Sequence, residues 1–342
     1  MKASRSLVVA AALTPLFAVA ADWLSADGDP ERTRWQKHET ELTPATLPGV
    51  KLLWKREFED RLSAPVALGP IYTHRGVKEL VFVAGASSHI YAVDADLNRV
   101  FWQRKLETSA VSWVCSGDPP PAPAISLAAA PARKSDDPSS PKRPIYMLTS
   151  DGLLHTLRPT DGVEIRPPVA FLLPGSHVSN LNLDDGSVKV TTNLTCSDKP
   201  KSALLPATAW TLDINTLGAK PRASSHFDLT FGSSATWKDA SGLEWTYVPN
   251  PTGIRAFHKT NDPVWTSTAL PNPASPVIAN GMVFTLSEGV LVAMDAITGK
   301  QLYSSGNATH VSTTTDSLAI ANGHIFFVSG NVLFCFGFPI EI

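Results

Sequence analysis

The side chains of this 342-residue chain that could do chemistry are dispersed, and no catalytic motif of known spacing joins them. Gly-x-Ser-x-Gly elbows, phosphate-binding loops and zinc-protease motifs are absent, and the nine histidines show no His-x-x-x-His spacing. Calcium needs several oxygen ligands at about 2.3–2.6 Å. The densest acidic stretches, Asp94-Ala95-Asp96 and Asp184-Asp185, lie in predicted hairpin turns, where Asp is common for local hydrogen bonding alone. We interpret both as turn residues and predict no metal site.

The three cysteines, Cys115, Cys196 and Cys335, leave room for one disulfide in an oxidising compartment. Cys335 lies in the apolar run 332–336, which is typical of a buried strand, so we expect it to be the unpaired thiol. Cys115 and Cys196 lie at loop-like positions beside small and polar residues. The sequence is compatible with a Cys115–Cys196 disulfide and equally with free thiols at both positions.

The elements that must position these residues are β-strands, because helical periodicity is almost absent and short β-rich runs alternate with Gly, Asn and Asp turns. One phrase recurs: an apolar strand, a small turn, and a second strand that ends near an Asp and a further turn. Its copies cover 81–99, 145–162, 188–213, 245–257, 282–300 and 325–336. Each copy follows an entry strand of small and polar residues, beginning near Ala64, Pro123, Ser179, Ser234, Ser275 and Ser312.

The spacing of the entry strands, about 37 to 59 residues, suits a four-stranded sheet with its loops. We predict an all-β chain that forms a single β-propeller of six four-stranded blades; seven or eight blades are the less favoured counts. The last copy ends after three strands, so segment 51–58 can supply its outer strand and close the ring by pairing the N- and C-terminal strands. The predicted domains are an extension packed on the ring (21–49) and the propeller (50–342), with a mobile loop at 131–143.

The N-terminus has the pattern of a secretory signal peptide: a basic start, an apolar stretch at 7–19, and small residues in Ala18-Val19-Ala20. The apolar run is shorter than the about 20 residues of a membrane-spanning helix. We therefore expect cleavage after Ala20 and a periplasmic or secreted protein, with a membrane anchor as the alternative. The formal charge of −2 and the lack of a basic run argue against nucleic acid as a partner, and we expect a monomer without a membrane span.

Two repeat phrases, Ala92-Val93-Asp94-Ala95 and the fuller stretch 293–300, resemble the repeat of pyrroloquinoline-quinone (PQQ)-type propellers. Asp22-Trp23, Gly28-Asp29-Pro30, Thr33-Arg34 and Leu53-Trp54 are similar to the opening of quinoprotein alcohol dehydrogenases, and the resemblance covers nearly all of the chain after residue 20. The resemblance implies a propeller in which an aromatic side chain after each Asp/Gly turn docks on the next blade. Trp102, Trp265 and Tyr303 fit that role.

The chain departs from this family where the family's chemistry resides. The resemblance implies eight blades, two adjacent bridged cysteines, a stacking Trp, a calcium ion held by Glu, Asn and Asp, and a catalytic Asp. This sequence has no Cys-Cys pair and no Cys-x-x-Cys-His haem motif, and it is too short for eight ordinary blades. We therefore assign no catalytic residue, and PQQ with calcium is implied as a cofactor by the resemblance alone.

Residues just before the entry strands would gather at one mouth of a central channel, where propellers often bind ligands. In this chain they are Arg61, Trp113, His177, Phe231, Asn272 and His310, and the simpler interpretation is that they fill or cap the channel. We expect a ligand- or protein-binding module without a recognisable catalytic site. The alternatives are a divergent PQQ-dependent alcohol or sugar oxidoreductase that uses the channel mouth, and a scaffold similar to the propeller that assists outer-membrane protein assembly. The missing lipid-anchor Cys counts against the scaffold.

Overall fold

The described secondary structure of the chain is β throughout, apart from one 3-10 turn, η1 (Leu47–Gly49). The computed structural model describes residues 20–109, 126–129, 143–172, 174–176, 178–184, 186–192, 208–213, 222–224, 234–309 and 318–339. The prediction of an all-β chain is confirmed. A search of these residues for a helix long and apolar enough to span a membrane finds none.

The strands form six mainly antiparallel sheets, numbered here in chain order. Sheet 1 contains β3 (Val66–Thr73), β4 (Gly76–Ala84), β5 (His89–Asp94) and β6 (Arg99–Lys105). Sheet 2 contains β7 (Ser126–Ala129), β8 (Ile145–Leu148), β9 (Leu153–Leu157) and β10 (Glu164–Ala170). Sheet 3 contains β11 (Val178–Asp184), β12 (Ser187–Thr192), β13 (Thr208–Asp213) and β14 (Arg222–Ser224).

The remaining sheets hold the C-terminal strands and two strands from the N-terminal part of the chain. Sheet 4 contains β15 (Ala235–Lys238), β16 (Glu244–Asn250), β17 (Gly253–Phe257) and β18 (Trp265–Thr266). Sheet 5 contains β19 (Val277–Ala279), β20 (Met282–Ser287), β21 (Val290–Asp295), β22 (Gln301–Ser304) and the short β1 (Trp35–Gln36). Sheet 6 contains β23 (Leu318–Ala321), β24 (His324–Ser329), β25 (Val332–Gly337) and β2 (Lys51–Glu57).

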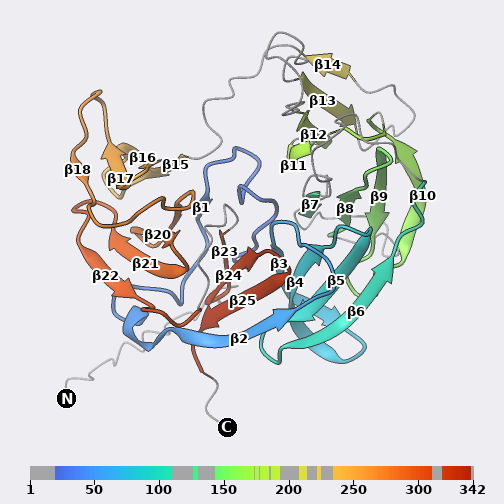
Figure 1. Cartoon of the computed structure of the whole chain (residues 1–342), viewed down its shortest axis with the longest axis horizontal. Helices are drawn as coiled ribbons and strands as arrows, with labels where there is room; N and C mark the ends of the chain where they lie inside the picture. Colours follow the sequence, from blue (N-terminus) through green and yellow to red (C-terminus); the bar gives the residue numbers. More distant parts are fainter. Residues whose placement is uncertain are drawn as a thin grey trace, which may run out of the picture.

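The six sheets stand side by side around an arc, with the first strand of each sheet toward the centre (Figure 1). The first strands of neighbouring sheets contact one another in the order β15, β19, β23, β3, β7, β11. The arc therefore runs from sheet 4 through sheets 5, 6, 1 and 2 to sheet 3. Residues 225–233, which join sheets 3 and 4 along the chain, lie outside the described part, so the closed six-bladed ring stays a prediction.

The two ends of the chain pair in sheet 6, as the sequence predicts. β2 runs antiparallel to β25, with Trp54 opposite Cys335 and Lys55 opposite Phe334. Cys335 is a buried free thiol, which confirms the expectation for this residue. Cys115 and Cys196 lie outside the described residues, so the predicted disulfide is not tested.

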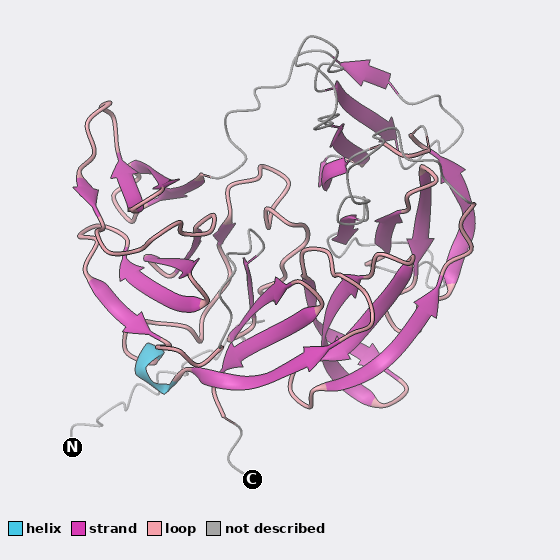
Figure 2. Ribbon diagram, viewed as in Figure 1, coloured by secondary structure: helices cyan, strands magenta, loops and turns pink. Residues whose placement is uncertain are grey.

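Outer strands lie along the rim of the arc (Figure 2). Aromatic side chains on three of them, β6, β18 and β22, join their sheets to the next ones. The indole Nε1 of Trp102, on β6, donates to Pro159 O of sheet 2 at 2.7 Å, and Trp265, on β18, donates to Ala296 O of sheet 5 at 2.9 Å. The hydroxyl of Tyr303, on β22, donates to Val50 O, just before β2, at 3.1 Å. The docking role predicted for Trp102, Trp265 and Tyr303 is confirmed.

The docked indoles explain two glycines in the recurring turns. Gly162 has φ +69° and Gly299 has φ +70°, a region that favours glycine. A Cβ atom at either position would lie 2.6 Å from a ring atom of Trp102 or Trp265, respectively. The turn must therefore bend tightly and also lack a side chain, which is why the Asp/Gly phrase recurs.

Residues 20–50, called here the axial segment, first run near the centre of the arc, where they contact all six sheets, and then turn outward so that η1 lies against the outer strand β22 (Figure 1). The segment pairs with Ala67 of sheet 1 through Trp23 and binds Arg143, at the start of sheet 2, through Asp22. Asn182 of sheet 3 and Thr236 of sheet 4 each donate a hydrogen bond to a backbone carbonyl of the segment. Sheet 5 binds the segment through the parallel pair of β1 with β19. The contact with sheet 6 is a hydrogen bond from Gln36 Nε2 to Ile320 O. The extension that the sequence predicts on the ring thus lies along the inner strands.

Candidate functional site

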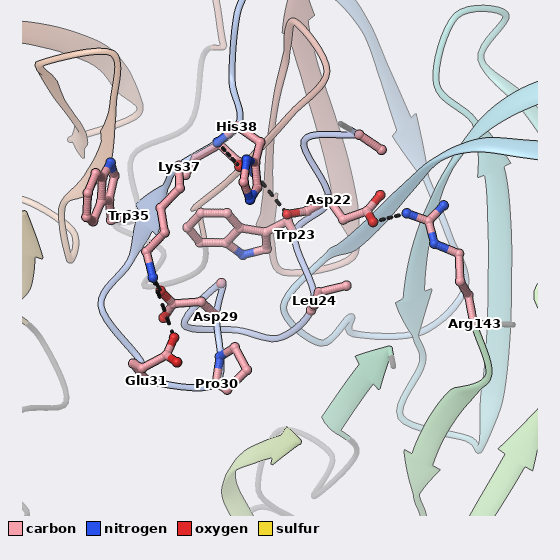
Figure 3. Close-up of a pocket in the computed structure, with 13 residues that line it drawn as sticks. Asp22, Trp23, Leu24, Asp29, Pro30, Glu31, Trp35, Lys37, His38 and Arg143 are labelled. Atoms are coloured by element: carbon pink, nitrogen blue, oxygen red, sulfur yellow. Dashed lines mark hydrogen bonds and ion pairs between the residues drawn. The ribbon is translucent and has the colours of Figure 1, made fainter. Parts of the chain in front are cut away.

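A pocket of about 460 Å³ opens beside the axial segment. Figure 3 shows the indole of Trp23 across its middle, with Asp22 and Arg143 on one side and Lys37, Asp29 and Glu31 on the other. The lining residues are Ala20, Asp22, Trp23, Leu24, Gly28, Asp29, Pro30, Glu31, Trp35, Gln36, Lys37, His38 and Arg143. Except for Arg143, a single stretch of chain builds this pocket, which we call the axial pocket.

Two aspartates fold the axial segment into the compact loop that shapes the pocket. The carboxylate of Asp27 binds Arg32 at 2.9 Å and Arg34 at 2.6 Å, and both arginines have positive φ angles. The carboxylate of Asp29 accepts from the backbone N of Thr33 at 2.7 Å and from its hydroxyl at 2.5 Å. These bonds turn the chain back on itself, so that residues 29–31 face residue 37 across the pocket.

The charged groups of the pocket are already paired. Arg143 binds the carboxylate of Asp22, and Lys37 Nζ lies 3.0 Å from Asp29 and 3.5 Å from Glu31. Burial alone would lower the pKa of Lys37, but the hydrogen bonds and charges of the two carboxylates outweigh it and raise the pKa. With three carboxylates against two cations, the lining carries one excess negative charge.

Two buried donors beside these pairs lack an acceptor within the described part of the chain: Nε1 of Trp23 and Nε of Arg143. A buried N–H without an acceptor costs about 1–3 kcal/mol. Gly28, with φ +85°, leaves room for the Trp23 ring, since a Cβ there would come within 2.8 Å of it.

A second hollow of about 330 Å³ continues the axial pocket toward sheet 4. Both hollows share the side chains of Trp35 and Lys37, and Lys37 Nζ lies 5.4 Å from the centre of the Trp35 ring. The far wall is the cross-strand pair Trp237–Trp245 of β15 and β16, where Nε1 of Trp245 donates to Asp239 at 3.0 Å. We call the two hollows together the axial groove; indole rings and paired charges line it.

The channel-mouth residues that the sequence suggests are not among those that line the groove. Arg61 and Asn272 are exposed and precede β3 and β19, whereas Arg143 and Lys238 lie at the connections between first and second strands, at the opposite ends of the sheets. The other four candidates lie outside the described residues: Trp113, His177, Phe231 and His310.

Sequence reasoning missed the groove for two reasons. The phrase from Asp22 to Arg34 stood out through its resemblance to a family opening, but nothing in its pattern shows that it lies along the axis. Arg143 ends the stretch 131–143, which reads as a loop rich in Pro, Ser and charge; residues 131–142 lie outside the described part. One signal could have indicated an aromatic wall: Trp237 and Trp245 flank a short predicted hairpin turn, so they could be expected to lie opposite each other on paired strands.

The described residues of the groove do not fit PQQ. This quinone carries three carboxylates, whereas the pocket has an excess of carboxylates and its two cations, Lys37 and Arg143, are already paired. The mismatch is one of charge, since Trp35 and Trp237 do offer half-buried ring surfaces. Among the described residues, the one group of three side chains that could hold a metal ion is Glu79, Asp96 and His324, none of which lines the groove.

No family model matches the chain, and no curated protein sequence matches it. Among solved structures, a quinohemoprotein alcohol dehydrogenase from Comamonas testosteroni is similar at 12% identity and a TM-score of 0.49, over 94% of this chain and 81% of that one. BamB from Moraxella catarrhalis is similar at 12% identity and a TM-score of 0.34, over 86% and 99%. The computationally designed Ika8 protein gives 12% and 0.36, over 82% and 98%. These similarities concern the fold alone, and the interpretation of the groove rests on the residues of this chain.

Proposed function

We propose that this chain is a binding module that takes a neutral, oxygen-rich ligand with a flat apolar face, the chemistry of a sugar, in the axial groove. The observation that carries the proposal is the continuity of the two hollows through Trp35 and Lys37. A volume of about 460 Å³ lies within the usual range of small-molecule sites, roughly 300–1,000 Å³. The resemblance to quinoprotein propellers supports the fold in this proposal and is not used to choose the ligand.

The lining supports a neutral ligand over a charged one. Each cation of the groove already has a carboxylate partner, including Lys238, which lies 3.1 Å from Glu244. A charged ligand would have to break one of these pairs. Hydroxyl groups can instead add hydrogen bonds to paired ions, while the half-buried rings of Trp35 and Trp237 offer surfaces on which a sugar ring can stack.

The proposed scaffold is a closed six-bladed propeller. Sheets 4, 5, 6, 1, 2 and 3 follow one another around the arc, and the outer-strand aromatics dock in one direction at successive junctions. Closure would bring sheet 3 against sheet 4, next to the end of the groove formed by Trp237 and Trp245. The closed ring would then place the groove at one end of a central channel.

Titration of the purified protein with a panel of neutral mono- and oligosaccharides, followed by calorimetry and by thermal unfolding, tests the proposal. We expect saturable binding that Trp35→Ala and Trp237→Ala each weaken about tenfold, the equivalent of about 1.4 kcal/mol. Tyr72→Ala, which removes an aromatic side chain that is 82% exposed and outside the groove, is the matched control and should leave binding unchanged.

Binding that survives both tryptophan substitutions, or no saturable binding across the panel, would contradict the proposal. The same assay includes PQQ with Ca²⁺. Saturable binding of the quinone, together with dye-linked oxidation of an alcohol, would instead support the oxidoreductase that the sequence resemblance implies.

We also propose that the chain is exported and cleaved after Ala20. The signal-peptide pattern supports this, and so does the burial of Ala21, whose backbone N donates to Asn322 Oδ1 at 2.8 Å. Cleavage would leave Ala21 as the first residue, already held against sheet 6. Intact-mass measurement of the protein from a bacterial periplasmic fraction should give a chain that starts at Ala21; an uncleaved precursor in the membrane fraction would argue for the anchor instead.

A further inference from the structure

A second group of chemistry-bearing side chains lies away from the groove, where sheet 6 meets sheet 1. His324 begins β24, Glu79 lies on β4, and Asp96 lies in the turn between β5 and β6. Their nitrogen and oxygen ligand atoms all lie within 4.8 Å of one another. The sequence suggests only a turn role at 94–96. That role suits Asp94, which binds Lys78 and the backbone N of Leu97, but it does not account for Asp96.

The contacts of His324 are too long for the hydrogen-bonded pairs that the chain forms elsewhere. His89 Nδ1 lies 2.7 Å from Asp60, and His155 Nδ1 lies 2.6 Å from Glu164, both within the range of charge-assisted hydrogen bonds. His324 Nδ1 lies 3.4 Å from Glu79, and Nε2 lies 3.6 Å from Asp96. A proton shared between Nε2 and Asp96 would draw the two atoms closer than this.

The backbone fixes which nitrogen of His324 is available. Nδ1 lies 3.0 Å from the carbonyl oxygen of Asn322, which can only accept, so Nδ1 carries a proton and donates. In the neutral ring the lone pair is then on Nε2, and it faces the Asp96 carboxylate, another acceptor. A backbone carbonyl that orients a histidine through its other nitrogen is a common arrangement around bound metal ions.

The distance between the two facing acceptors matches a pair of metal ligands. Bonds of about 2.0–2.1 Å to a tetrahedral Zn²⁺ place neighbouring ligand atoms about 3.3–3.4 Å apart. The observed separation of 3.6 Å between Nε2 and Asp96 Oδ1 is close to that value. The carboxylate of Glu79 completes the group within 4.8 Å, so its side chain would close in on the ion when the ion binds.

The charge around the cluster also calls for a cation. Two carboxylates of the axial segment lie beside residue 323, next to His324: that of Glu41 fills the space that a side chain on Gly323 would need, and that of Glu39 accepts from the backbone N of Gly323. Glu39 cannot move to relieve this crowding, because its Oε1 accepts from the backbone N of Thr40, Glu41 and Leu42, and its Oε2 from that of Gly323. Four carboxylates thus surround one imidazole.

We propose that Glu79, Asp96 and His324 bind a divalent metal ion of the Zn²⁺ class, with His324 coordinating through Nε2. The ion would link sheet 1 to sheet 6, the sheet in which the two chain ends pair. The Asp96 side chain is 43% exposed and gives the ion an entry path, whereas His324 is only 12% exposed. The fourth position remains open for water or for Glu41.

The test is a Zn²⁺ titration of the full chain after treatment with a chelator, in competition with a chromophoric chelator. We expect one high-affinity ion per chain, and at least tenfold weaker binding in Asp96→Asn. Glu164→Gln is the matched control: it alters an equally exposed carboxylate that is hydrogen-bonded to a histidine, and it should bind Zn²⁺ like the unmodified chain. The absence of saturable binding in the unmodified chain, or equal binding in Asp96→Asn, overturns the proposal.

X-ray absorption at the zinc edge provides a second readout that does not depend on folding of the variant. The expected spectrum shows nitrogen and oxygen ligands, including one imidazole, and no sulfur. A sulfur shell would assign the ion to a cysteine and overturn the site. Chelation should also lower the midpoint of thermal unfolding of the unmodified chain and leave that of Asp96→Asn unchanged. Sugar binding in the groove is measured separately, so each proposal can fail alone.

Discussion

Asp60 illustrates how one buried carboxylate organises a turn at the residue scale. Its oxygens accept from the Ser87 hydroxyl at 2.5 Å and face His89 Nδ1 at 2.7 Å, and they fill the space that a side chain on Gly85 would need. Burial alone would raise the pKa of Asp60, but these hydrogen bonds outweigh it and hold the pKa below its usual value. Asp60 therefore stabilises the fold in its ionised form.

The sign of this shift predicts a pH-dependent effect of Asp60→Asn. A carboxyl group whose pKa is lowered by folding contributes stability above its unfolded pKa of about 4, and the contribution disappears as pH falls through the lower folded pKa. We expect Asp60→Asn to lower the free energy of unfolding by about 1–3 kcal/mol at pH 7, and the difference to shrink toward zero in strong acid. Urea unfolding at several pH values measures it, with the exposed Asp262→Asn as control; a difference independent of pH would contradict the assignment.

Individual functional residues are where sequence reasoning had least to work with. Asp96 reads as an ordinary turn aspartate, and only the packing of sheet 1 on sheet 6 brings it to His324. Arg143 reads as the end of a loop, yet it forms one wall of the axial pocket. Turn chemistry and site chemistry use the same residue types, so the local pattern cannot separate them.

Elements were more predictable, because each strand copy carries its own turn and its own docking aromatic. The recurring phrase identified β4 with β5, β20 with β21, and β24 with β25, and the pairing of β2 with β25 followed from the incomplete last copy. The entry strand predicted near Ser312 stays a prediction at its start, because residues 310–317 lie outside the described part and β23 is described from Leu318 onward. β1, only two residues long and parallel to β19, has no periodicity to reveal it.

Trp54 tests the docking of one sheet on the next. Its ring is buried on β2, and Nε1 donates to Ala95 O in the turn of sheet 1 at 2.7 Å. Trp54→Phe keeps most of the apolar contact but leaves a buried carbonyl without its donor. We therefore expect the free energy of unfolding to fall by about 1–3 kcal/mol in urea denaturation.

The control for Trp54→Phe is the same substitution at Trp237, whose indole nitrogen has no partner among the described residues. That variant should change stability by less than about 1 kcal/mol. If both substitutions lowered the free energy of unfolding equally, the loss of ring volume, and not the loss of the hydrogen bond to Ala95 O, would explain the effect at Trp54.

At the scale of the whole molecule, the axial segment runs along the inner strands and contacts all six sheets. Composition, the β class and six repeat units could be read from the sequence, since they depend on local pattern. The path of residues 20–50 could not, because it is fixed by scattered long-range contacts, such as the hydrogen bonds from Asn182 and Gln36 and the ion pair between Asp22 and Arg143. The axial segment lines most of the axial pocket, so the position of the groove could not be predicted from the sequence either.

The axial segment also sets an order of events during synthesis. It leaves the ribosome first, yet the carbonyl that receives Gln36 belongs to a residue made 284 positions later. Until that strand is synthesised, Trp23 and Leu42 lack part of the core in which they are buried, since the same core includes Ile320. A prematurely terminated polypeptide would therefore keep its N-terminal residues but lack the contacts that hold them in place.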